Sequence, residues 1–91
     1  MSTAAAQFKI LPENIDIDLE KLQTSIKEKI ESFKSGVVSN IKEEPIAFGL
    51  KALIVTFAIS EEQEIDQVEN AASEIKGISS VELIDYRRAI G

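Results

Sequence analysis

Apolar residues recur at helical spacing in two segments of the chain. The first stripe advances by three or four residues and comprises Leu19, Leu22, Ile26, Ile30 and Phe33. Asp16 or Asp18 is placed to cap the start of this helix, and Ser35–Gly36 is placed to end it. The second stripe comprises Ile65, Val68, Ala72 and Ile75 and ends at Lys76–Gly77. The spacing therefore predicts two amphipathic helices.

Four further segments have the character of strands. Residues 7–11 alternate and stop at Pro12, residues 37–42 lead into Glu44–Pro45, and residues 78–86 are half apolar. Residues 50–59 are almost entirely apolar, which is typical of a central strand. The alanines before residue 7 either extend the first strand or lie outside it. Residues 87–91 follow the last strand as a short basic tail.

The order strand–helix–strand–strand–helix–strand predicts an α+β fold of the ferredoxin-like βαββαβ type. In this sandwich a four-stranded antiparallel sheet carries two helices on one face. The first and third strands are central, which agrees with the apolar run at 50–59. Pro45 suits an edge strand because proline cannot donate to a ladder. The open face of such a sheet would be partly apolar, so a partner, a loop or a second copy of the chain is expected to cover it.

Composition narrows the function further. We expect residues 1–91 to form one domain, and the chain contains neither cysteine nor histidine. Without these side chains an enzyme, a metal site or a bound cofactor is not expected. The net charge of −6 disfavours direct binding to nucleic acid. Residues 1–6 do not resemble a signal peptide and no apolar segment is long enough to span a membrane, so the expected location is cytoplasmic.

The candidate catalytic groups all have simpler explanations. Carboxylates occur in pairs at Glu43–Glu44, Glu61–Glu62 and Asp16/Asp18, where solvated or helix-capping roles are commoner than acid–base chemistry. Phe8 and Phe57 resemble core residues more than a base-stacking pair, because the basic residues of an RNA-binding sheet are missing.

The turn at Ile46–Gly49 allows two interpretations. Phe48 beside a turn glycine is either packed back into the core or held out as a binding anchor. The residues alone favour packing into the core. Lys51 would ordinarily be solvated, and Arg87 and Arg88 would ordinarily be a solubilising tail.

Residues 44–53, with the sequence EPIAFGLKAL, resemble the strand–turn–strand segment of the archaeal elongation factor 1-beta family. Outside this block the similarity lies in element order, length and acidity. The resemblance implies a guanine-nucleotide exchange factor that acts on elongation factor 1-alpha, in its GDP-bound and nucleotide-free forms, during translation elongation. Such a factor performs no catalytic chemistry of its own.

The resemblance also assigns roles to residues. Phe48 matches the turn phenylalanine that docks against the GTPase, and its neighbours Ile46, Gly49 and Lys51 match the rest of that segment. With this match, the docking interpretation of Phe48 becomes the preferred one.

A second role falls at the end of the chain. Arg88 aligns with the penultimate lysine that eukaryotic members direct toward the magnesium and phosphate site, and Arg87 is the alternative. Arginine replaces lysine here, and Ala89–Gly91 continue beyond it. A competing hypothesis treats the chain as a ferredoxin-like regulatory or assembly module that binds a small molecule or a partner through its open sheet face.

Overall fold

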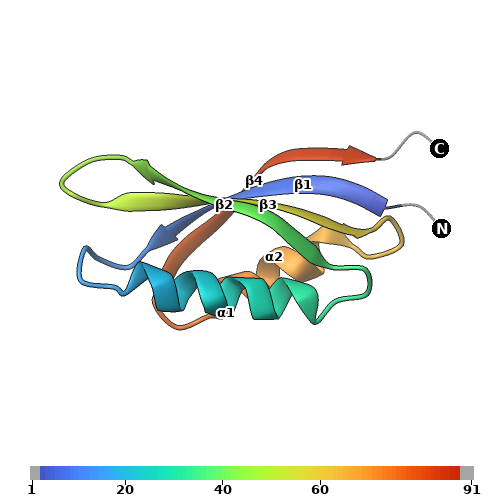
Figure 1. Ribbon diagram of the computed structural model, residues 1–91, viewed down its shortest axis with the longest axis horizontal. Coiled ribbons are helices and arrows are strands. Elements are labelled where there is room, and N and C mark those ends of the chain that lie inside the picture. The colour runs from blue at the N-terminus through green and yellow to red at the C-terminus, as the bar shows by residue number, and fades with distance from the viewer. Residues whose placement is uncertain (1–2, 89–91) are drawn as a thin grey trace.

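A computed structural model describes residues 3–88 (Figure 1). The elements follow the predicted order and are β1 (Thr3–Pro12), α1 (Leu19–Glu31), β2 (Val37–Pro45), β3 (Lys51–Ser60), α2 (Ile65–Ser73) and β4 (Ile78–Arg88). The described helices are not long and apolar enough to cross a membrane.

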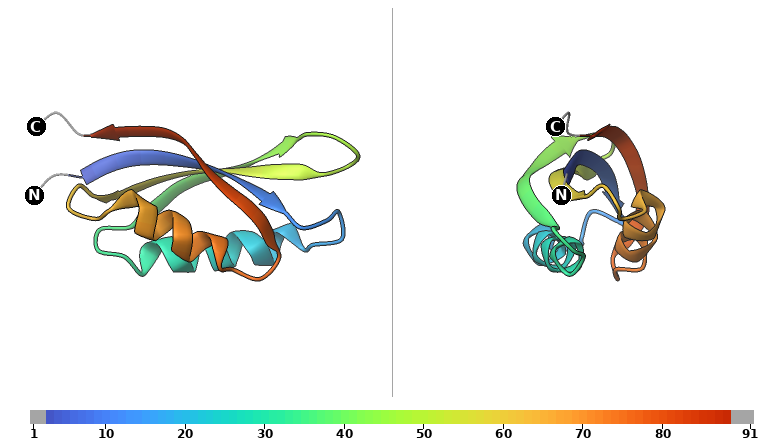
Figure 2. Two further views of the ribbon diagram at one scale, coloured as in Figure 1. Left: turned by 180° about the vertical axis from the view of Figure 1, so that it is seen from behind. Right: turned by 90° about the vertical axis from the view of Figure 1, so that its right-hand side faces the viewer.

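The four strands form one antiparallel sheet in the order β2-β3-β1-β4. The first and third strands are therefore central and Pro45 lies on an edge strand, as predicted. Both helices pack on the same face of the sheet (Figure 2). This arrangement confirms the α+β ferredoxin-like fold.

The core lies between the sheet and the helices. Alternate residues of β1 and β3 are buried there, with Phe8 and Phe57 in contact at 4.8 Å between ring centroids. Leu22, Ile26 and Ile30 complete the core from α1, and α2 contributes Val68 and Ala72. On the opposite face, Ile54, Thr56 and Ala58 of β3 are only partly buried, because no helix among the described residues covers that side.

Helix α1 ends earlier than the apolar stripe predicts. It stops at Glu31, and the Ser32 hydroxyl donates to the carbonyl of Lys29 at 2.6 Å. Phe33 therefore lies outside the helix, although it still packs against the core. Ser35 takes the positive φ, of 62°. Gly36 is needed for space instead, since a Cβ there would lie 2.1 Å from the carbonyl oxygen of Ile30.

Strand β4 is longer than predicted, and β1 takes the longer of the two forms that the sequence left open. The early alanines belong to β1, where Ala4 and Ala6 face the core. Because β1 begins at Thr3, it offers pairing partners to the last residues of β4. Arg87 and Arg88 pair with Ala5 and Ala4. They are strand residues and not a tail, which corrects the prediction.

Candidate partner-binding site

The β2–β3 hairpin closes in a tight turn. Leu50 N–H donates to the carbonyl of Ala47 at 3.0 Å, and Ile46 N–H donates to the carbonyl of Leu50 at 2.9 Å. The two central residues, Phe48 and Gly49, have positive φ values of 57° and 80°. Positive φ at both central positions matches the right-handed twist of the flanking strands. Gly49 adopts this geometry readily, whereas Phe48 does so at a steric cost.

Phe48 points away from the core. Its side chain is 96% exposed, the largest value among the exposed large hydrophobics of residues 3–88. The packing that the residues alone favoured is therefore wrong, and the turn displays the ring. A bulky residue in a left-handed conformation with no buried contact gains nothing for the fold, which makes Phe48 a candidate for contact with a partner.

The neighbours of Phe48 differ in how they are placed. Ile46 is 41% exposed and belongs to the same turn. Lys51 begins β3 and lies 3.5 Å from a carboxylate oxygen of Glu43. Because both partners are substantially exposed, this ion pair stabilises the hairpin by at most about 1 kcal/mol.

One further residue lies near this turn and was not predicted from the sequence. Ile15, in the loop between β1 and α1, is 64% exposed, and its Cγ2 lies 3.7 Å from the position that a Cβ on Gly49 would occupy. The sequence feature that could have identified Ile15 is its position outside the apolar stripe of helix α1. Ile15 and Ile17 alternate between polar residues, and only Ile17 packs against the core.

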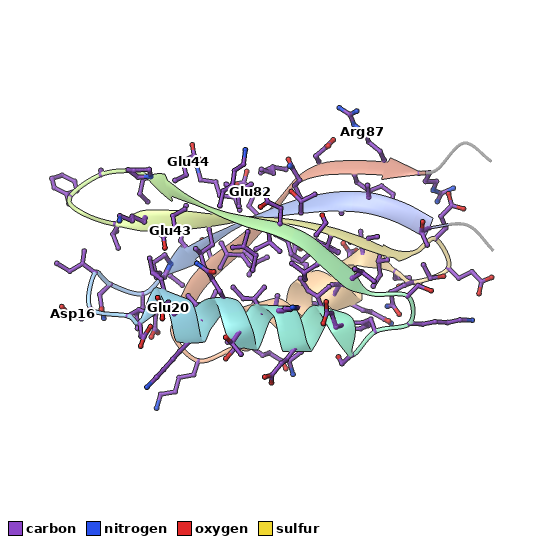
Figure 3. All side chains as sticks on the ribbon, in the orientation of Figure 1. Asp16, Glu20, Glu43, Glu44, Glu82 and Arg87 are labelled. Atoms are coloured by element: carbon purple, nitrogen blue, oxygen red, sulfur yellow. The ribbon has the colours of Figure 1, made fainter. Side chains whose placement is uncertain are left out.

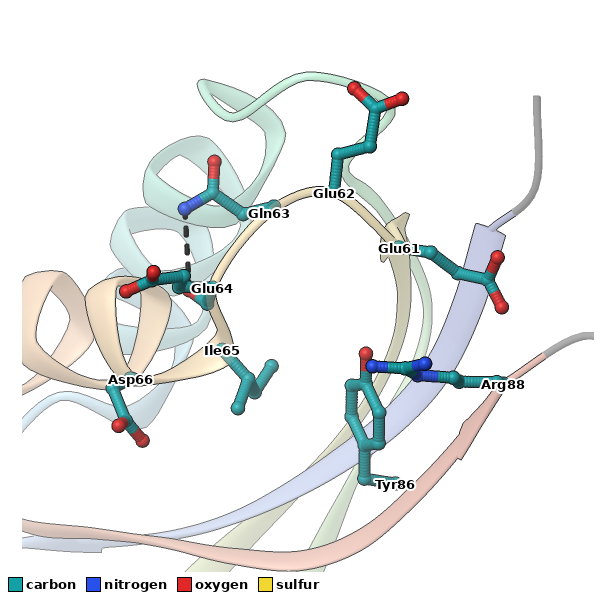
Figure 4. Close-up of a pocket in the computed structure, with 8 residues that line it drawn as sticks. All are labelled: Glu61, Glu62, Gln63, Glu64, Ile65, Asp66, Tyr86 and Arg88. Carbon is teal, nitrogen blue, oxygen red and sulfur yellow. Dashed lines mark hydrogen bonds between the residues drawn. The ribbon is translucent and has the colours of Figure 1, made fainter.

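The two arginines occupy opposite faces of β4, because side chains alternate along a strand. Arg87 lies on the open face opposite Ala5, and its Nε is 3.3 Å from a carboxylate oxygen of Asp85. Arg88 lies on the helix side opposite Ala4. It lines a shallow depression with Tyr86 and the acidic segment 61–66 (Figure 4).

These residues form two groups and not a single site. The hairpin turn lies at one end of the long axis, and the paired ends of β1 and β4 lie at the other (Figure 1). The molecule extends 43 Å along this axis. Ile59 is level with Ala4 and Arg88 and lies eleven positions beyond Phe48, so the two are roughly 35 Å apart. Residues 89–91, which bear on the comparison with a terminal lysine, lie outside the described part of the chain.

The carboxylate pairs are placed as capping and surface groups. Asp18, and not Asp16, caps helix α1, accepting from the N–H groups of Glu20 and Lys21 at 3.1 and 3.3 Å. Glu61 and Glu62 lie in the loop before α2. Within residues 3–88, no three acidic side chains are grouped as a metal site would require.

Comparison with known proteins gives a consistent result. A family model described as the EF-1 guanine nucleotide exchange domain matches residues 5–88. A protein named elongation factor 1-beta from Methanosarcina barkeri is 40% identical over 89 residues, covering 97% of this chain and 99% of the relative. The protein of the same name from Methanosphaera stadtmanae is 42% identical over 89 residues, covering 97% and 98%.

Proposed function

Because the chain belongs to the family of EF-1 guanine nucleotide exchange domains, we propose that it acts on elongation factor 1-alpha. The family has a nucleotide-exchange role in translation elongation. The finer proposal is that this chain binds the GDP-bound GTPase, releases GDP and holds the nucleotide-free form until GTP enters. The observation that carries the choice of site is the exposed, left-handed Phe48 at the hairpin tip.

Exchange requires differential affinity. A factor that binds the loaded and the empty GTPase equally well shifts nothing, and the coupling between factor and GDP is reciprocal. Weakening GDP binding a hundredfold therefore requires the factor to bind the empty form about 2.7 kcal/mol more tightly. The two ends of the molecule make different contributions to this binding.

The hairpin end supplies docking energy. Phe48 makes the same contact whether or not nucleotide is bound, so it increases the affinity for both forms. An aromatic ring that is buried on binding is a typical hot spot and contributes about 2 kcal/mol or more.

The end that carries the arginines supplies the difference in affinity between the empty and the GDP-bound GTPase. A guanidinium near the magnesium and phosphates competes with the ion and with the loops that hold GDP. Arg88 is the preferred residue because its side chain projects on the helix side beside Tyr86, whereas Arg87 already pairs with Asp85. The sheet keeps the two ends roughly 35 Å apart, so one molecule contacts two separate regions of the GTPase.

Release of a fluorescent GDP analogue from purified elongation factor 1-alpha tests both parts. The intact chain is expected to accelerate release. Phe48→Ala should raise the concentration for half-maximal acceleration about 30-fold and leave the maximal rate unchanged. Arg88→Ala should lower the maximal rate about tenfold or more, because loss of a charge-assisted contact costs about 1.5–3 kcal/mol.

The control variants distinguish the loss of any positive charge from the loss of the charge at position 88. Lys27→Ala removes an exposed cation from α1 and should change neither quantity. Arg87→Ala shows which arginine acts. If the intact chain fails to accelerate release, the proposed function is wrong and a binding module remains. If acceleration survives both Phe48→Ala and Arg88→Ala, the function stands but the site assignment fails.

A further inference from the structure

We infer that Ile15 is a second docking anchor and that the β1–α1 loop and the β2–β3 turn form one binding surface. This surface, called here the apolar tip, consists of Ile15, Ile46 and Phe48. It fits an apolar depression bordered by basic side chains. The inference rests on the proposed function, since the partner it names is the GTPase.

Exposed hydrophobic residues gather at the end of the molecule that carries the β2–β3 turn. Five large hydrophobic residues are exposed within residues 3–88, and three of them form the apolar tip. These three come from two segments that are about thirty residues apart in the sequence. The other two, Val37 and Ile84, lie elsewhere in β2 and β4. Single exposed hydrophobics are normal on a protein surface, but a cluster drawn from separate loops indicates an interaction site.

The two loops lie close together. A Cβ added at Gly49 would lie 3.7 Å from Ile15 Cγ2, so the isoleucine side chain is within about one carbon atom of the turn backbone. Ile15 therefore stands directly beside the turn that displays Phe48. A partner that receives the ring also meets the isoleucine.

The β1–α1 loop holds Ile15 in place. At its start, Glu13 N–H donates to the carbonyl of Gly77 at 2.9 Å, and Asp16 N–H donates to the side chain of Asn14 at 2.9 Å. At its end, Ile17 packs against the core and Asp18 caps helix α1. With Ile17 turned inward, Ile15 is turned outward. A side chain presented by a fixed loop loses little conformational entropy on binding, which favours affinity.

The charges around the apolar tip select the partner. Asp16 follows Ile15, and Glu43 and Glu44 lie in the arm of β2 that leads to the turn (Figure 3). Lys51, at the start of the neighbouring strand β3, is paired with Glu43. A second copy of this chain would bring carboxylates against carboxylates, whereas a basic rim would complement them. The surface therefore fits a partner with a basic rim, the role we assign to the GTPase, better than it fits a second copy of this chain.

A double-mutant cycle tests the inference. The full chain carrying Ile15→Ala, Phe48→Ala or both is titrated against elongation factor 1-alpha in the GDP-release assay. Ile15→Ala should raise the half-maximal concentration about tenfold with an unchanged maximal rate, as expected for loss of a buried aliphatic contact. The double variant should lose less than the product of the single effects, because the two side chains share one contact region.

Ile84→Ala is the matched control, since Ile84 is exposed on β4 and should not change the half-maximal concentration. Thermal melts should show all variants folded, because each substituted side chain lies at the surface. Asp16→Asn should slow association and reduce its dependence on salt concentration, whereas Glu28→Gln on α1 should not.

The outcomes distinguish the two proposals. If the intact chain releases GDP and Ile15→Ala binds as well as the parent, the inference is overturned while the exchange function stands. If Ile15→Ala instead changes the oligomeric state in sedimentation without changing GTPase binding, the tip is a self-association surface and the inference fails. If the intact chain does not release GDP at all, the proposed function itself fails.

Discussion

Replacing Phe48 with asparagine should stabilise the fold while removing the docking ring. Phe48 is 96% exposed, so it buries only about 8 Å² of a side chain of about 200 Å², worth about 0.2 kcal/mol. Its φ of 57° costs about 1–2 kcal/mol for an ordinary L-residue. Asparagine tolerates this region better, and Asn-Gly is the preferred pair for a turn with two positive φ values. The expected net gain for Phe48→Asn is about 0.5–1 kcal/mol.

Urea denaturation followed by circular dichroism measures this change. In a thermal melt, the same gain of 0.5–1 kcal/mol should raise the melting temperature by about 2–8 °C in a domain of this size. The same variant should be as defective in GDP release as Phe48→Ala, because the ring is gone in both. Greater stability with lower activity is expected where a strained residue serves binding and not folding.

Phe57→Ala is the contrasting substitution. Phe57 is 1% exposed and contacts Phe8 at 4.8 Å, so its loss should cost about 3–5 kcal/mol. A decrease of more than about 1 kcal/mol in the unfolding free energy of Phe48→Asn would contradict the exposed, strained placement of Phe48. That result would mean that the ring packs against the protein in solution.

Two further predictions concern the supporting structure and use the same denaturation assay. Gly36→Ala should cost about 2–3 kcal/mol because its Cβ meets a backbone oxygen at 2.1 Å, whereas the Cβ of Gly49→Ala would lie at an ordinary van der Waals distance of 3.7 Å from Ile15 Cγ2 and should cost about 1 kcal/mol from its φ of 80°. Equal losses would contradict the steric argument. Asp18→Ala should cost about 1 kcal/mol through loss of the α1 cap, and Asp16→Ala should stay within about 0.5 kcal/mol. The reverse order would show that Asp16 is the cap.

The secondary structure was largely predictable because it depends on local spacing. The apolar stripe through Leu22, Ile26 and Ile30 identifies α1, and the unbroken apolar run of β3 identifies a central strand. The element ends were less predictable. The stripe extends to Phe33, but α1 stops two residues earlier, because Ser32 caps its end and Gly36 must pass close to Ile30.

The candidate site was predictable only in part. The block around Phe48 indicates the hairpin and its turn. The residues alone favoured packing of the ring into the core, and only the resemblance to the family favoured an exposed ring. Composition suggests a basic tail at Arg87 and Arg88, yet pairing with Ala5 and Ala4 makes them strand residues that face opposite sides of the sheet. Their distance from Phe48 depends on strand register, which no local pattern contains.

The sequence by itself thus determined the order of elements, the central position of β3 and the turn that carries Phe48. The tertiary structure decided between the two interpretations of Phe48 by showing it exposed, and it alone showed that Ile15 stands beside the turn and that Arg88 lies at the far end of the molecule. The physical reason is the range of the interactions involved. Periodicity and turn chemistry act over a few residues, whereas the placement of Ile15 against Gly49 results from packing between segments that are distant in sequence.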